Sequence, residues 1–419
     1  MACDSAGLVG EDRVHGSLYT DPQVFDQEMD RIFRRGWVFV GHESEVPATG
    51  DWVTRRIGRE PVLMVRDRDR KLQVLANRCA HRGTALCWQE RGNSRSFQCT
   101  YHGWTFALDG SLLGVPHRGG FDRDKADLAL DRPGQVESHR GFVFANLSGD
   151  AGPLGAHLGR GGTALIDRLC DLSPSGELRL TAGWIGHRIE SNWKMWPESD
   201  NDGYHLDFVH ASMLRAAPDS YYQDTVVGGE AGNASRAVDL GNGHFELDMR
   251  PSYRKPLQWL GTSPDKAGSY CAGLVARHGA ARAAALQQDG PPHAMIFPNL
   301  FLGELNLARI EPLSLAATVH HHTAVQFDGV DESFNRRLLR QSEAALGPAS
   351  FIVPDDAVVA ERMQSGMQGA AGERGWIDLS RGRQREQRTA DGGRSGHISD
   401  EVTNRAFWRH YRGVMESRA

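Results

Sequence analysis

The sequence predicts an α+β protein with a β-structured N-terminal domain and a mixed C-terminal domain. Short β-patterned runs, such as residues 62–65 and 141–145, are punctuated by Gly and Asp over residues 38–150. A glycine-rich stretch at 149–162 follows, and beyond it strand patterns mix with apolar residues at helical spacing. With 419 residues, 40% of them hydrophobic, the chain is long enough to bury sizeable cores.

Residues 1–37 form a separate segment ahead of the β domain. Four apolar residues recur there at helical spacing before Gly36, namely Phe25, Met29, Ile32 and Phe33. We expect this helical segment to pack on the C-terminal domain. The domains are therefore placed at residues 38–150 and 151–419.

Two short clusters in loops of the β domain indicate a metal site. Cys79 and His81 form the first cluster, and Cys99 and His102 form the second. In a Rieske [2Fe–2S] centre two Cys hold one iron and two His hold the other, and the imidazoles raise the reduction potential. The same residue types also suit a structural zinc site. Cys87 lies between the clusters and is left outside the site, because a lone Cys is usually a small buried hydrophobe.

A second metal-binding pattern lies at residues 192–210. Asp202, His205 and His210 share one polar stretch of an otherwise aromatic-rich, helical segment. Two imidazoles and a carboxylate that leave positions open suit non-haem Fe(II) for oxygen chemistry. On an ideal helix His205 and His210 lie about 140° apart, so a straight helix cannot direct both at one metal. We therefore expect a break or π-bulge between them. The alternative is that both are ordinary surface or core polar residues.

The third ligand of such a site is expected from a distant carboxylate. The run at 351–356 ends in Pro354, Asp355 and Asp356 and resembles a helix entry, which Asp355 could simply cap. Asp356, Asp355 and Glu361 all stay open as ligands on this reasoning. The helix that follows should bury an apolar stripe made of Val358, Val359, Met363 and Met367.

Residues 77–108 resemble the Rieske domain of ring-hydroxylating oxygenases, including Arg82-Gly83 after the first His and Gly103-Trp104 after the second. Residues 192–210 are similar to the mononuclear iron motif of the large subunits of these enzymes. The tail from Gly396 to Met415 is also similar, so the resemblance spans nearly the whole chain. One departure is Ser199, where the family usually carries Asn directly after the position of Glu198.

The resemblance implies a role for each candidate residue. The Rieske cluster would be held by Cys79, His81, Cys99 and His102, and a mononuclear iron by His205, His210 and Asp356. Asp202 would carry electrons between subunits, by hydrogen-bonding a cluster ligand of the neighbouring subunit and His205 of its own. This requires a homotrimeric ring. The catalytic domain would have the helix-grip fold, in which an antiparallel sheet encloses a pocket over the iron.

The function implied by the resemblance is that of the oxygenase alpha subunit of an aromatic ring-hydroxylating dioxygenase. Electrons from NAD(P)H would arrive through a ferredoxin, a flavin reductase or both, and the assembly would be a homotrimer or, with a small beta subunit, an α3β3 hexamer. The substrate class expected is an aromatic carboxylic acid, such as benzoate, salicylate, anthranilate or terephthalate. A Rieske monooxygenase with the same metals is the alternative, and a non-catalytic electron carrier is a third.

Residues 295–297 and 302–305 are expected to line the substrate pocket. His320-His321-His322 resembles a metal-binding tract, but strand alternation places His321 on the face of Val325 and Phe327, so only His320 and His322 could act together. Gly159 to Gly162 does not have the spacing of a dinucleotide-binding loop and is interpreted as a linker.

Composition is that of an ordinary enzyme. The formal net charge of −5 argues against a nucleic-acid partner. The sequence has no run of eighteen apolar residues and no signal-like start, so we expect a cytoplasmic protein without a membrane partner. Six Cys in a chain of this length do not indicate a disulfide framework.

Overall fold

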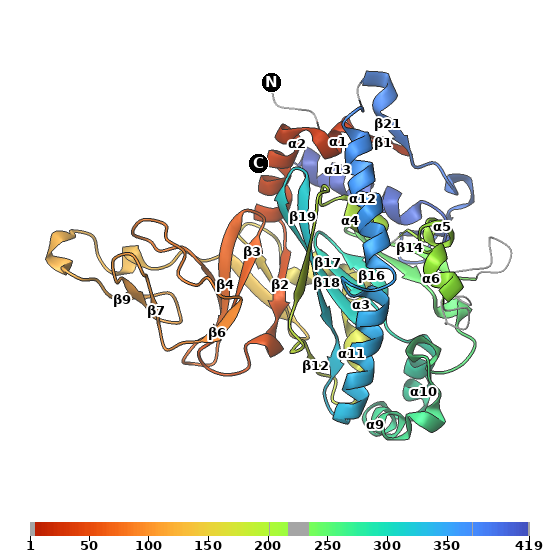
Figure 1. Cartoon of the computed structure of the whole chain (residues 1–419), viewed down its shortest axis with the longest axis horizontal. Helices are drawn as coiled ribbons and strands as arrows, with labels where there is room; N and C mark the ends of the chain where they lie inside the picture. Colours follow the sequence, from red (N-terminus) through yellow and green to blue (C-terminus); the bar gives the residue numbers. More distant parts are fainter. Residues whose placement is uncertain (1–4, 201, 217–233, 371, 418–419) are drawn as a thin grey trace. The chain divides into compact units, whose positions relative to one another are not determined.

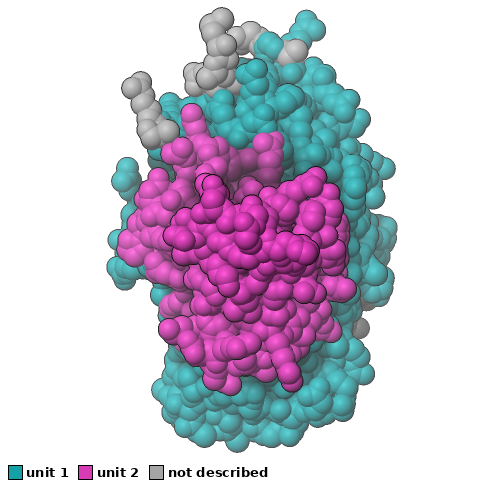
Figure 2. All heavy atoms as spheres, turned by 90° about the vertical axis from the view of Figure 1, so that its left-hand side faces the viewer, with its two compact units in different colours: residues 1–28, 155–419 teal, residues 29–154 magenta. Residues whose placement is uncertain are grey.

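The computed structural model describes residues 5–200, 202–216, 234–370 and 372–417. The chain divides into two compact units, shown in different colours in Figure 2. The inserted unit is residues 29–154, and the larger unit combines residues 1–28 with 155–419. The division therefore falls inside the N-terminal segment that was predicted as residues 1–37.

The inserted unit is built from short antiparallel strands. It opens with a π-helix, η1 (Met29–Arg34), that continues α2 (Pro22–Glu28), so the helix predicted to end before Gly36 is confirmed. Its three sheets have the orders β10-β11-β2, β5-β4-β3-β6 and β7-β8-β9. The strands are β2 (Val38–His42), β3 (Asp51–Ile57), β4 (Glu60–Arg66), β5 (Leu72–Ala76), β6 (Arg91–Asn93), β7 (Phe97–Gln98), β8 (Thr105–Phe106), β9 (Leu112–Gly114), β10 (Gln135–His139) and β11 (Phe142–Asn146). The strand patterns at 62–65 and 141–145 correspond to β4 and β11.

The larger unit is organised around a nine-stranded antiparallel sheet of order β13-β19-β18-β17-β16-β15-β14-β23-β22 (Figure 1). Its strands are β13 (Ile185–Ile189), β14 (Arg236–Gly241), β15 (His244–Asp248), β16 (His293–Ile296), β17 (Leu300–Gly303), β18 (Asn306–Ser314), β19 (Ala317–Ala324), β22 (Gln387–Arg388) and β23 (Arg394–His397). Two further strand pairs are β1 (Arg13–His15) with β21 (Trp376–Asp378), and β12 (Leu178–Arg179) with β20 (Gln326–Phe327). A β unit joined to a mixed unit confirms the predicted α+β class.

Helices pack against this sheet from distant parts of the chain. Two of them pack at different places along the sheet: α11 contacts β18 and β19, whereas α13 contacts β14 and β15. The helices of the unit are α1 (Ser17–Thr20), α2, α3 (Leu154–Asp171), α4 (Met195–Ser199), α5 (Leu206–Val209), α6 (Ala211–Ala216), α9 (Gly268–His278), α10 (Ala280–Asp289), α11 (Glu332–Leu346), α12 (Val353–Met367) and α13 (Val402–Glu416). In the described part of the chain, no helix is long and apolar enough to cross a bilayer.

Gly159 to Gly162 lie within α3, so their interpretation as a linker was wrong. The helix kinks at Gly159, where φ is 57° and ψ is −169°. A side chain would strain this backbone conformation, and glycine adopts it readily. Leu158 and Leu165 are buried on either side of the kink. Their burial outweighs the low helix propensity of the glycines.

The buried face of α12 also differs from the predicted stripe. Val358 is 46% exposed, and the face turned inward consists of Val353, Asp356, Ala357, Ala360 and Gln364. Small and polar residues occupy this face because it carries a site residue and because Gln364 accepts a hydrogen bond from the backbone N–H of Asn192 (2.9 Å). Apolar periodicity alone therefore indicates the wrong side of this helix.

The tail that resembles the family ends in a helix. α13 starts at Val402, with Glu401 as its N-cap residue. Asp400 accepts a hydrogen bond from the backbone N–H of His397 (2.9 Å) and pairs with Arg385. These bonds close the turn between β23 and α13.

Candidate metal centres and active-site pocket

Two loops of the inserted unit have matching backbone geometry. The N–H of Cys79 donates to Thr84 O (2.8 Å), and that of Gly83 donates to Cys79 O (3.0 Å). In the second loop Cys99 donates to Trp104 O (2.8 Å) and Gly103 donates to Cys99 O (3.0 Å). Gly83 and Gly103 both have positive φ, 75° and 69°. Each loop thus presents one Cys and, two or three residues beyond it, one His.

The four side chains meet as a thiol pair and an imidazole pair. Cys79 and Cys99 are buried and their thiols interact with each other, and no disulfide joins them. The rings of His81 and His102 lie edge to face with centroids 4.6 Å apart, and His81 stacks on Trp104 at 4.8 Å. His81 Nδ1 is buried without a hydrogen-bond partner among the described residues. Two thiols beside two imidazoles, one nitrogen of which lacks a partner, fit a [2Fe–2S] cluster with two Cys on one iron and two His on the other.

Cys87 belongs to the hydrophobic core of this unit, as its exclusion from the site predicted. Burial raises the pKa of its thiol to about 11. The side chain of Asn77 fixes this part of the loop, because its Oδ1 accepts from the N–H of Leu86 and of Cys87 and its Nδ2 donates to Cys87 O. Cys87 therefore packs as a protonated apolar side chain.

In the larger unit, buried polar contacts fix the segment that leads into the second site. Lys194 Nζ donates to Glu28 Oε1 (2.7 Å), and both side chains are fully buried. Trp193 Nε1 and Tyr411 Oη also donate to Glu28, at 2.9 and 2.6 Å. This accounts for the Trp-Lys pair in the motif, since a buried carboxylate is stable only when its hydrogen bonds are satisfied.

Glu198 forms a second anchor in the same segment. Its two oxygens both lie 2.8 Å from Tyr19 Oη, which donates one shared hydrogen, and Oε1 also accepts from Trp408 Nε1 (2.6 Å). Burial raises the pKa of this carboxyl to about 7. The segment is thus held by donors from α1 and α13.

The predicted break between the two histidines is confirmed. Asp202 lies in an irregular stretch after α4, and His205 precedes α5, which covers only Leu206–Val209. His210 has φ −98° and ψ 21°, outside the helical region, and α6 starts directly after it. Three short helices, α4, α5 and α6, occupy this segment. The bend turns both imidazoles toward the same point.

Three donor atoms converge there. His205 Nε2 lies 3.1 Å from His210 Nε2, and the two nitrogens lie 3.4 and 3.3 Å from Asp356 Oδ1. Donors about 2.1 Å from one metal in mutually cis positions are about 3.0 Å apart, so these atoms form one face of a coordination shell. Asp356 Oδ1 is buried and has no hydrogen-bond partner of normal geometry among the described residues. The donor set fits a divalent metal and leaves the opposite face open.

Asp355 and Glu361 do not reach this point. The nearest contact of Asp355 is 3.8 Å, from its Oδ2 to His210 Nδ1 on the far side of the ring. Glu361 instead accepts a hydrogen bond from the backbone N–H of Glu190 (3.2 Å). Of the three carboxylates left open by the sequence, the structure therefore brings only Asp356 to the two histidines.

Asp202 lies behind His205 rather than at the converging point. Its Oδ2 is 3.3 Å from His205 Nδ1, and its Oδ1 accepts from the N–H of Tyr204 (2.6 Å). Burial lowers the pKa of His205, but the carboxylates of Asp202 and Asp356 outweigh burial and raise it to about 10. The carboxylates thus favour positive charge at the centre of the site, and Asp202 fixes the ring orientation of His205.

Both parts of the chain match known protein families. Residues 36–126 match the Rieske [2Fe-2S] domain, and residues 177–417 match the ring hydroxylating alpha subunit catalytic domain. The chain belongs to the ring-hydroxylating alpha subunits. The large subunit of 2-halobenzoate 1,2-dioxygenase from Burkholderia cepacia is 31% identical over 396 residues, covering 89% of this chain and 80% of that protein. The large subunit of anthranilate 1,2-dioxygenase from Acinetobacter baylyi is 30% identical over 400 residues, covering 88% and 80%.

The fold of this alpha subunit matches that of solved relatives. Naphthalene 1,2-dioxygenase from Rhodococcus sp., solved with indole bound, superposes with a TM-score of 0.82 at 26% identity, covering 97% of this chain and 95% of that chain. The predicted architecture, a Rieske domain followed by a catalytic domain of antiparallel sheet and helices, is confirmed. Membership of this family brings both a Rieske cluster and a mononuclear iron.

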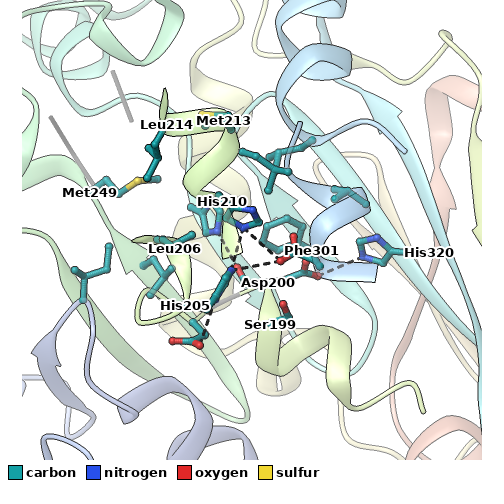
Figure 3. Close-up of a pocket in the computed structure, with 18 of the residues that line it drawn as sticks. Ser199, Asp200, His205, Leu206, His210, Met213, Leu214, Met249, Phe301 and His320 are labelled. Atoms are coloured by element: carbon teal, nitrogen blue, oxygen red, sulfur yellow. Dashed lines mark hydrogen bonds and ion pairs between the residues drawn. The ribbon is translucent and has the colours of Figure 1, made fainter. Parts of the chain in front are cut away.

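The alpha subunit has a pocket over the three converging donors (Figure 3). Apolar side chains from α5, α6, β15, β17 and the start of α12 form much of its wall. They include Leu206, Met213, Leu214, Leu247, Met249, Phe301, Ile352 and Val353. Such a lining suits an aromatic ring next to the open face of the metal site.

The polar part of the wall was mostly missed by sequence reasoning. Asp200, His293, His320 and His322 all line the pocket. Residues 295–297 and 302–305 are not among the described lining residues, whereas their neighbours His293 and Phe301 are. In β19, His320 and His322 are buried and His321 is partly exposed beside Glu311 (3.0 Å), so the face predicted as core was the wrong one. In the sequence, the feature that could have pointed to this polar wall is the position of Asp200, two residues before Asp202.

Proposed function

We propose that this alpha subunit is the terminal oxygenase of a dioxygenase system that adds both atoms of O2 to an aromatic ring. The observation that carries the proposal is the convergence of His205, His210 and Asp356 on one point in an apolar pocket. The same chain contains a second set of redox-metal donors, Cys79, His81, Cys99 and His102. Together the two donor sets would bind one centre that accepts electrons and one centre that reacts with oxygen.

In the proposed mechanism the metal ligands and the pocket residues have separate roles. When bound, the cluster supplies one-electron transfer and the iron supplies oxygen activation. His205, His210 and Asp356 would hold the iron, and the apolar pocket beside them would hold an aromatic ring. The apolar wall excludes water from the reacting atoms, which limits side reactions.

Asp202 is proposed to connect the two kinds of site across a subunit boundary. Its carboxylate already contacts Nδ1 of His205, and its side chain is 21% exposed. This arrangement supports a homotrimer, with or without a small beta subunit, in which Asp202 also accepts from a cluster ligand of the neighbouring chain. A ferredoxin, a flavin reductase or both would deliver the electrons, as is usual in this family.

The names of the two relatives described above support an aromatic acid as substrate, as the sequence led us to expect. Monooxygenation with the same metals is the competing reaction, and product analysis distinguishes the two. A single turnover of chemically reduced protein with heavy-isotope O2 needs no partner protein. Two heavy oxygens in one ring product support the proposal, and one heavy oxygen or loss of a methyl group refutes it.

The metal content is measured on the same samples. We expect about three irons and two acid-labile sulfides per chain. His210→Ala is the matched negative control, because it removes one donor of the iron site and leaves the cluster loops unchanged. It should keep the sulfide and form no product. Zinc without sulfide in the original protein would refute the proposal.

A further inference from the structure

A buried hydrogen-bonded chain ends at the pocket on the side of Asp200. His320 Nδ1 lies 2.7 Å from His322 Nε2, and His322 Nδ1 lies 3.3 Å from Asn306 Oδ1. Asn306 Nδ2 in turn donates to Ser342 Oγ (2.9 Å). His320 stacks on Trp196 with ring centroids 4.2 Å apart, so the chain is held rigidly.

The direction of each hydrogen bond follows from its neighbours. Asn306 Oδ1 can only accept, so His322 Nδ1 carries the hydrogen. Burial lowers the pKa of His322 well below its usual value and lowers that of His320 to about 3, so both rings are neutral. A neutral His322 then accepts at Nε2 from His320 Nδ1. This leaves a lone pair at His320 Nε2.

That lone pair faces another acceptor. His320 Nε2 is 3.3 Å from Asp200 Oδ2, and neither atom has a hydrogen-bond partner of normal geometry among the described residues. Figure 3 shows Asp200 between His320 and the converging metal donors. Two acceptor atoms this close are satisfied by one proton, which Asp200 Oδ2 carries toward His320 Nε2. Asp200 also lines the pocket, so its other oxygen can accept a hydrogen bond from a ligand there.

We propose that Asp200 and His320 select aromatic substrates that carry an uncharged N–H or O–H substituent, such as an arylamine, an aryl amide or a phenol. This inference rests on the proposed ring oxygenation, but it assigns a substrate class other than the aromatic acid that the names of the relatives support. The substituent donates to the free oxygen of Asp200, which His320 holds in place, while the ring packs on the apolar wall. This contact orients the ring over the metal site. Both residues are positioning and specificity residues.

The same geometry disfavours the aromatic carboxylate that the sequence led us to expect. A carboxylate only accepts hydrogen bonds, and here it would meet the free oxygen of Asp200, which also accepts. A buried carboxylate needs a cation or several donors to replace its hydration. None of the described lining residues is Lys or Arg. Residues 217–233, which follow α6, contain no Lys or Arg in their sequence.

Matched ligand pairs test the inference by equilibrium binding and by single turnover. Aniline and toluene have similar shapes but differ in N–H donors, and benzamide and benzoate differ in the same way and in charge. We expect benzamide to bind more tightly than benzoate. Asp200→Leu removes the accepting oxygen, so the preference for aniline over toluene should fall about tenfold, the usual worth of one hydrogen bond. Asp200→Asn should keep the preference, because its NH2 group donates to His320 and its oxygen still accepts from the substituent.

Two further variants complete the design. His320→Gln should reduce the same preference if Asp200→Leu fails to fold. His321→Gln is the matched control on the opposite face of β19 and should leave the preference unchanged. An unchanged preference in both Asp200→Leu and His320→Gln, or tighter binding of benzoate than of benzamide, overturns the inference even if rings are oxygenated. Selective binding of N–H donors without oxygen incorporation into any ring overturns the proposed function and leaves the recognition inference standing.

Discussion

The carboxyl of Glu198 should make the stability of the catalytic unit depend on pH in a way that one substitution removes. Burial raises the pKa of Glu198 from its ordinary value of 4.5 to about 7. The folded protein therefore binds more protons than the unfolded chain between these values. In this window the free energy of unfolding falls as pH rises. Ionised Glu198 therefore lowers the free energy of unfolding. This loss is fully present above about pH 7 and absent below about pH 4.5.

The size of the effect follows from the two pKa values. At 1.36 kcal/mol for each pKa unit, the contribution lost between pH 4.5 and pH 8 is about 3 kcal/mol. In Glu198→Gln the amide oxygen still accepts from Trp408, and the Tyr19 hydroxyl can rotate to accept from the new NH2 group. A neutral amide forms weaker hydrogen bonds than a carboxylate, at a cost of about 1 kcal/mol. The variant should therefore be more stable than the original protein at pH 8 by about 2 kcal/mol, and slightly less stable at pH 5.

Urea unfolding followed by tryptophan fluorescence measures this difference at the two pH values. Glu416→Gln is the control, since Glu416 is an exposed glutamate on the same helix as Trp408 and pairs only with Arg412 (2.7 Å). Its pH dependence should match that of the original protein. Equal loss of stability between pH 5 and pH 8 in the Glu198→Gln and original proteins would refute the reasoning.

Further predictions concern the two metal centres. Asp356→Asn should lose about one iron per chain and keep its sulfide, whereas Asp355→Asn should keep all its iron; equal iron loss in both variants would contradict the geometry. Asp202→Asn should weaken iron binding or lower turnover about 10- to 100-fold, because it no longer fixes the ring of His205, and titration of the apoprotein with Fe(II) measures the first effect. Cys79→Ser should abolish the visible absorption of the cluster, and Cys87→Ser should retain it with a loss of about 1–3 kcal/mol in stability. Bleaching in both Cys variants would place Cys87 in the site.

The sequence was most informative where chemistry restricts the choice of residue. Cys and His at fixed positions in two loops, and Asp202 with two histidines, were located without coordinates because few other patterns bind redox metals. The break at His210 was also predictable, since helix geometry forbids a shared metal for two residues five apart. Choosing Asp356 over Asp355 required the family resemblance, and the distances now support that choice independently.

The features that sequence reasoning missed depend on which side of an element faces the pocket. The stripe of α12 and the alternation of β19 were both assigned to the wrong face, because buried Asp356 and His320 occupy positions where a pattern rule expects apolar side chains. Asp200 and His293 have ordinary neighbours in sequence, and only the tertiary structure brings them to the same wall. Polar residues that serve a site do not follow the periodicity of a core.

The anchoring of the active-site segment has a consequence for protein synthesis. Glu28 and Glu198 take their hydrogen bonds partly from α13, which is C-terminal to the other described helices that hold the site. The inserted unit, residues 29–154, is synthesised well before α13. A nascent chain would therefore be able to fold its electron-carrying unit first, and the oxygen-reactive centre would be completed only once α13 has been synthesised. Oxygen activation would then begin only after the side chains that hold the active-site segment are in place.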